Sequence, residues 1–97
     1  MSRAFINEDA GGDALGKYPL PDPGDPAFPL AAARALLRGA DEGDTVGAEA
    51  ATGFYWGDPS LRREVTQLLA EAQEEGNERM EQLAERYLKK TERTERT

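Results

Sequence analysis

The sequence contains no cysteine and no histidine. Without cysteine the chain has neither disulfides nor thiolate ligands for a metal. Without histidine it lacks the commonest general base and the commonest metal ligand. We therefore expect a non-catalytic protein that holds no cofactor, and the missing cysteine is compatible with a reducing cytoplasm.

Long apolar runs are missing as well. No segment approaches the ~20 consecutive apolar residues that a membrane helix needs. The acidic residues Glu8 and Asp9 stand where a signal peptide would have its apolar segment. We expect a cytoplasmic protein that does not bind membranes.

Positive charge is scarce relative to negative charge. The 97 residues include 12 basic and 19 acidic side chains, which give a formal net charge of −7. Nucleic-acid binding draws its general affinity from Lys and Arg side chains that neutralise phosphates, and an acidic chain repels those phosphates. The composition therefore argues against a direct nucleic-acid partner. The length supports one domain with a single core.

Proline, glycine and apolar spacing divide the chain into three parts. Residues 1–29 hold five of the six prolines and show no periodicity, which predicts an extended Pro/Gly-rich arm. Residues 30–90 have apolar side chains at helical spacing, which predicts an all-α domain. Residues 91–97 repeat Thr, Glu and Arg without any apolar side chain, which predicts a polar tail that buries nothing.

Two short helices open the predicted domain. Apolar residues recur at helical spacing from Leu30, and Gly39 favours a helix end, so the first helix is predicted over about 28–38. The second is predicted over about 46–52, because an acidic turn precedes it and Gly53 follows it.

Two longer helices follow. Asp58 is a capping residue before a helix predicted over about 59–75, and Gly76 ends that helix. A fourth helix is predicted over about 77–90, directly after this glycine. Because the connection is so short, we expect the last two helices to form an antiparallel αα-hairpin whose apolar stripes face the rest of the core.

Three consecutive aromatic residues lie between two glycines before this hairpin. We expect Phe54 and Trp56 to fill the core and Tyr55 to face solvent. Arg62 and Arg63 stand near the start of a helix, where the helix dipole does not favour cations, and so they are candidates to bind a carboxylate. Trp, Tyr and Arg dominate binding hot spots. The predicted protein-binding surface consists of Tyr55, Trp56, Arg62 and Arg63.

These features favour a small acidic interaction module, with a second copy of the chain as its simplest partner and the last two helices as the contact. A second hypothesis is a divalent-metal-binding or small acidic enzyme domain that uses Asp41, Asp44 and Glu49. The spacing of these carboxylates is not that of an EF-hand loop. A third hypothesis is a structural subunit of a larger complex.

One family resemblance lies at the start of the chain. Residues 2–9, Ser-Arg-Ala-Phe-Ile-Asn-Glu-Asp, resemble the short amino-terminal segment before the coiled coil of some bacterial GreA/GreB-type transcription elongation factors. Asn7 stands where the family phrase has lysine, and the long coiled coil and the carboxy-terminal domain have no counterpart in this chain. The resemblance implies a connection with RNA polymerase, without the cleavage-stimulating activity of that family.

Overall fold

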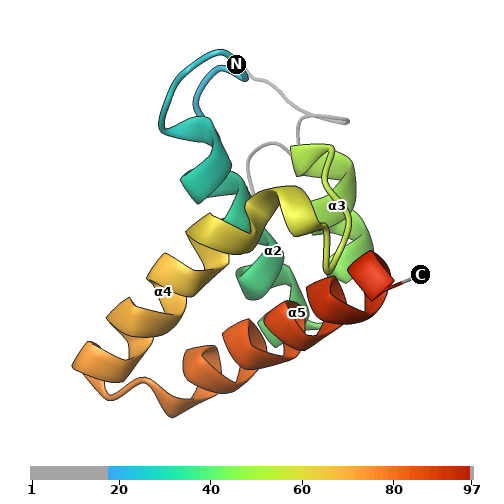
Figure 1. Ribbon diagram of the computed structural model, residues 1–97. Coiled ribbons are helices and arrows are strands. Elements are labelled where there is room, and N and C mark those ends of the chain that lie inside the picture. Colours follow the sequence, from blue (N-terminus) through green and yellow to red (C-terminus); the bar gives the residue numbers. More distant parts are fainter. Residues whose placement is uncertain (1–17, 97) are drawn as a thin grey trace.

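A computed structural model describes residues 18–96, with side chains as far as Arg93, and this part of the chain contains helices and no strand (Figure 1). The prediction of an all-α fold is confirmed. The four helices and the 3₁₀ turn that leads into the third of them are α2 (Phe28–Glu42), α3 (Thr45–Thr52), η1 (Pro59–Leu61), α4 (Arg62–Glu75) and α5 (Glu78–Arg96).

Helix α2 is longer than the sequence predicts. Gly39 does not end it but lies inside it, and Gly43, with φ +74°, is the residue that ends it. A Cβ atom at position 39 would lie 2.6 Å from the Cβ of Ala48 and 3.3 Å from the hydroxyl of Tyr18. Glycine is needed at this position because α3 and the segment before α2 approach the α2 backbone closely. The prediction of a helix end at this glycine was therefore wrong.

The predicted helix ends at Gly53 and Gly76 and the predicted cap at Asp58 agree with the structure. Gly53 ends α3 and Gly76 ends α4, each in the left-handed conformation. The carboxylate of Asp58 accepts a hydrogen bond from the backbone N–H of Ser60, although the first turn that it caps is 3₁₀. The side chain of Asn77 accepts a hydrogen bond from the backbone N–H three residues later and so caps α5.

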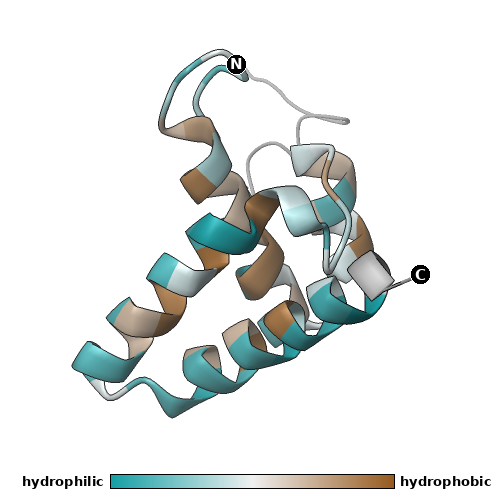
Figure 2. Cartoon of the chain, viewed as in Figure 1, coloured by the Kyte–Doolittle hydropathy of each residue, from teal (hydrophilic) through white to brown (hydrophobic). Residues whose placement is uncertain are grey.

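Helix α2 occupies the centre of the molecule and packs against α3, α4 and α5. Helices α4 and α5 also pack against each other, and the chain reverses between them at residues 76–77 (Figure 1). Hydrophobic and hydrophilic residues alternate along both, as expected for amphipathic helices (Figure 2). The largest side chains of the core are Tyr18, Leu36, Leu37, Leu61, Val65, Leu68, Leu83 and Tyr87.

The aromatic residues are distributed differently from the expectation. Among the aromatic side chains of residues 18–93, Tyr18 and Tyr87 are the fully buried ones, at 2% and 0% exposure. Phe54 and Trp56 are only partly buried and pack against the outside of the core. Tyr55 faces solvent as predicted, with 48% of its surface exposed. Residues 54–56, which we call the aromatic loop, therefore cover the core and do not fill it.

Both ends of the described chain add residues to the core. Residues 18–27 precede α2 and contain turns, and Tyr18 at their start is buried. Residues 1–17, including the segment 2–9 that carries the family resemblance, lie outside the described residues. At the other end α5 continues through the predicted polar tail, and Thr91 is fully buried with its hydroxyl donating to the carbonyl of Leu88. The expectation that the tail buries nothing was wrong for this threonine.

Candidate functional site

The structure places the four residues of the predicted binding surface at different depths. Tyr55 and Arg63 are exposed, whereas Trp56 and Arg62 are half-buried. The cations that line a hollow together with the indole of Trp56 come from α5 and are not the two predicted arginines. The structure therefore gives Trp56 a different set of charged neighbours from the one that the sequence predicts.

Trp56 is held in place by its surroundings. Its backbone N–H donates to the carboxylate of Glu49 at 2.8 Å. Its ring meets the ring of Tyr87 edge-on, with 5.0 Å between centroids and 74° between planes. The next residue, Gly57, has φ +89° and lies so close to the side-chain stem of Lys90 that a Cβ atom there would overlap it. These contacts fix the aromatic loop against α5.

Four cations on α5 line the hollow beside Trp56, which has a volume of about 320 Å³. Their spacing along the helix places them on one face, one turn and two turns apart. We call this set, together with the indole, the Trp56 surface. Sequence reasoning missed it because the spacing alone does not show that the aromatic loop packs on this face. The Trp56 surface consists of Trp56, Arg86, Lys89, Lys90 and Arg93.

The hydroxyl of Tyr87 joins α5 to the start of η1 and α4. It donates a hydrogen bond of 2.9 Å to the backbone carbonyl of Asp58. Burial, and then the nearby charge of Asp58, raise the pKa of this phenol well above its usual value. Tyr87 therefore stays neutral throughout the physiological range and acts as a structural donor.

The three carboxylates of the metal hypothesis have separate partners. Asp41 accepts from the guanidinium of Arg79 at 2.8 Å, and Asp44 accepts from the hydroxyl of Tyr18 at 2.8 Å. Glu49 accepts from the backbone of the aromatic loop. Among the described residues, no three Asp, Glu, His or Cys side chains come together in a way that could hold a metal ion. The structure therefore does not assemble the predicted metal site.

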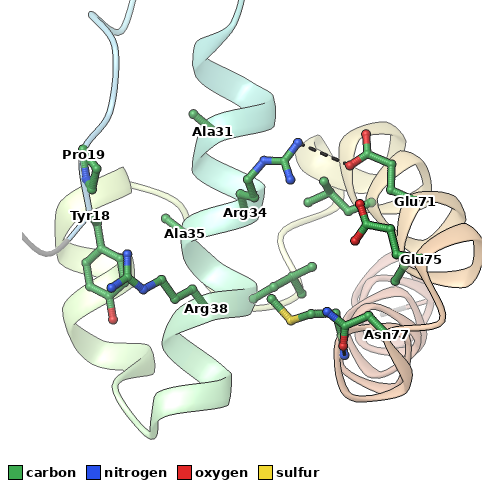
Figure 3. A pocket seen from close by; sticks show the side chains of 13 residues that line it. Tyr18, Pro19, Ala31, Arg34, Ala35, Arg38, Glu71, Glu75 and Asn77 are labelled. Atoms are coloured by element: carbon green, nitrogen blue, oxygen red, sulfur yellow. Dashed lines mark hydrogen bonds and ion pairs between the residues drawn. The ribbon is translucent and has the colours of Figure 1, made fainter.

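A larger groove lies beside α2, with α4 and the start of α5 on one side and the segment before α2 on the other (Figure 3). Its volume is about 420 Å³. The groove exists partly because three of its lining residues are alanines, whose short side chains do not fill the space between the helices. Its apolar lining residues are Tyr18, Pro19, Ala31, Ala35, Leu37, Leu68, Ala72 and Met80.

The two long walls of this groove carry opposite charge. Arg34 and Arg38 lie on the α2 wall, and Glu71 and Glu75 lie on the α4 wall (Figure 3). Arg34 and Glu71 approach to 3.4 Å across the groove, with both side chains still in contact with solvent. The guanidinium of Arg38 lies 5.8 Å from the ring centroid of Tyr18, at the arm side of the groove. The groove therefore combines an apolar floor with a basic wall and an acidic wall.

Within the described residues, no helix has the length and apolar character needed to cross a membrane. Comparisons with protein-family models, with curated proteins and with solved structures find no match for this chain. The groove and the Trp56 surface are therefore the features from which a function can be inferred.

Proposed function

We propose that this chain is a small non-catalytic protein-interaction module that binds an amphipathic segment of a partner protein in the groove beside α2. The observation that carries the proposal is an open groove whose floor is apolar and whose walls carry opposite charge. Helix-in-groove recognition uses this combination, because apolar side chains anchor the partner and flanking charges set its orientation.

The size and the charges of the groove suit such a segment. A volume of about 420 Å³ lies within the range of ~300–1,000 Å³ that is common for ligand-binding pockets. The ion pair between Arg34 and Glu71 is exposed and contributes only ~0.2–1 kcal/mol, so a partner can replace it with its own charges at little cost. The partner segment should carry acidic residues toward α2 and basic residues toward α4.

The groove can be blocked by one substitution on its wall. Ala31 lines the groove and is only half-buried, so Ala31→Trp should fill the space without disturbing the core. Ala50→Trp, on an exposed position of α3 outside the groove, is the matched control. Peptides selected from a displayed library should bind wild type and Ala50→Trp, and should bind Ala31→Trp at least about tenfold more weakly, because the anchor pocket is lost.

Nuclear magnetic resonance places the selected peptides on the surface. Backbone amide signals of Ala31, Leu68 and Ala72 should move more than those of α3 when a peptide is added. Equal binding to Ala31→Trp and Ala50→Trp, or signal changes confined to α3, would rule the groove out as the binding site.

Three further parts of the proposal rest on the sequence. Self-association is the simplest partnership, and light scattering of the purified chain measures it directly. Residence in the cytoplasm follows from composition. The resemblance of residues 2–9 supports RNA polymerase as a partner, and co-sedimentation of the full chain with purified bacterial RNA polymerase tests it. If the complex forms equally well after residues 2–9 are replaced by Gly and Ser, the inference that these residues bind RNA polymerase is wrong.

A further inference from the structure

We infer that the Trp56 surface binds an acidic segment of a partner protein. This surface shares no lining residue with the groove beside α2. The inference therefore stands apart from the proposed function, and either one can fail while the other holds.

The charge of the Trp56 surface is opposite to that of the whole chain. A chain with a net charge of −7 places four cations on one face of α5, between positions 86 and 93. Within the described part of the structure, neither Arg86 nor Lys89 forms an ion pair. Arg86 stands four residues before Lys90, and Lys89 four residues before Arg93, the spacing at which like charges on a helix repel each other.

The helix dipole does not account for this arrangement. Cations are favoured within the last turn of a helix, and α5 ends at Arg96. Arg86 and Lys89 lie more than one turn before that end. Their position is therefore better explained by a ligand that carries negative charge than by the stability of the isolated helix.

Trp56 supplies a fixed apolar contact beside these cations. Before any ligand arrives, the edge contact with Tyr87 supports the indole, and the hydrogen bond from the backbone N–H of Trp56 to Glu49 holds the backbone at this residue. A preorganised Trp beside Arg is the composition typical of a binding hot spot. An acidic segment with one aromatic or large apolar side chain matches this surface in both respects.

A protein segment fits better than a nucleic acid. The cationic face is limited to four side chains, whereas the remainder of the chain is strongly acidic. A nucleic acid would extend past this face and bring further phosphates toward negative charge, which repels them. A short acidic segment can end at the limits of the Trp56 surface.

Fluorescence of the full chain tests the inference, because Trp56 is its only tryptophan. The probe is a synthetic peptide of Glu and Ala with one central Phe, and its control has Gln in place of every Glu. The Glu peptide should change the emission of Trp56 in a saturable way, and added sodium chloride should weaken its binding. An equal response to the Gln peptide would overturn the inference.

Two double variants with the same change in net charge show where the peptide binds. Arg86→Gln with Lys89→Gln removes two cations of the Trp56 surface, both at exposed positions. This variant should bind the Glu peptide roughly two- to thirtyfold more weakly, the range for two exposed ion pairs. Arg63→Gln with Arg79→Gln removes two exposed cations that line neither the groove nor the Trp56 surface, and this variant should bind as tightly as wild type.

Circular dichroism confirms that both variants are folded, and calorimetry gives a second measure of binding that does not use Trp56. Equal weakening in both double variants would show that only net charge matters, and it would overturn the inference. A single-stranded oligonucleotide that binds more tightly than the Glu peptide, with the same loss on Arg86→Gln and Lys89→Gln, would overturn the choice of a protein segment.

Discussion

Tyr87 connects two parts of the molecule that are far apart in sequence. Its buried hydroxyl donates to the backbone carbonyl of Asp58, and its ring supports Trp56. Tyr87→Phe keeps the ring but removes one of the two donors to this carbonyl, which also accepts from the backbone N–H of Leu61. We expect the free energy of unfolding to fall by about 0.5–1.5 kcal/mol, the net contribution of one hydrogen bond, as measured by urea denaturation. Tyr55→Phe, at an exposed position, is the control and should change stability by less than ~0.5 kcal/mol.

The same hydroxyl predicts a dependence of stability on pH. Burial raises the pKa of Tyr87 in the folded chain, while the unfolded chain keeps a value near ~10. The folded state therefore holds this proton more tightly. The stability that comes from the neutral phenol is complete below about pH 10 and is lost as pH rises, by up to ~1.4 kcal/mol per pH unit.

Comparison of wild type with Tyr87→Phe isolates this one phenol from the lysines that titrate in the same range. The advantage of wild type in free energy of unfolding should be constant from about pH 7 to 9 and should shrink by ~1 kcal/mol near pH 11. A constant difference over the whole range would show that the folded-state pKa of Tyr87 is not raised.

Helices α2 and α3 depend on one glycine for their close contact. In an exposed helix, replacing glycine by alanine stabilises by ~1 kcal/mol. At Gly39 the added methyl group would lie 2.6 Å from the Cβ of Ala48 and 2.9 Å from the backbone oxygen of Asp44. We expect Gly39→Ala to lower the free energy of unfolding by about 1–3 kcal/mol, because the helices must move apart.

Thermal denaturation by circular dichroism measures this effect. Gly24→Ala is the control, since no atom lies within 4 Å of the added methyl group. A melting temperature for Gly39→Ala equal to or above that of wild type would mean that α2 and α3 separate without cost, and that close approach of α3 does not require glycine at this position.

The elements that the sequence predicts well are those with local signals. The glycines at 53 and 76 and the capping carboxylate of Asp58 act on their own neighbours, so their effect can be predicted without a fold. Gly39 has the same residue type, but its role depends on Ala48, which lies on another helix. A glycine needed for close approach and a glycine that ends a helix cannot be told apart without knowledge of this partner.

The candidate sites depend even more on tertiary contacts. The groove is lined by Ala31 and Ala35 of α2, and in sequence such alanines are equally typical of tight helix packing. The spacing of Arg86 and Lys89 predicts a charged helix face, yet nothing in sequence places Trp56 beside that face. Sequence reasoning therefore grouped Trp56 with Arg62 and Arg63, whereas the structure places cations of α5 beside it.

At the scale of the whole molecule, the excess of acidic side chains causes repulsion, whereas individual ion pairs attract. A net charge of −7 is spread over a chain whose radius of gyration is 14.6 Å. The ion pairs between the helices, Arg34 with Glu71 and Arg79 with Asp41, are half-exposed, so each contributes only ~0.2–1 kcal/mol. We therefore expect repulsion among the acidic residues to outweigh these pairs at low ionic strength.

This balance predicts opposite effects of salt on stability and on binding. At 0.01 M ionic strength the screening length is about 30 Å, longer than the radius of gyration, whereas at 0.15 M it is about 8 Å. Between these two concentrations of sodium chloride, the melting temperature should rise by a few degrees. For a domain of this size, about 4–8 °C corresponds to 1 kcal/mol of stability. Over the same range the Glu peptide should bind the Trp56 surface more weakly. Chloride is preferred to sulfate, because sulfate stabilises proteins by exclusion from their surface. A melting temperature that falls with salt would show that the ion pairs outweigh the net charge.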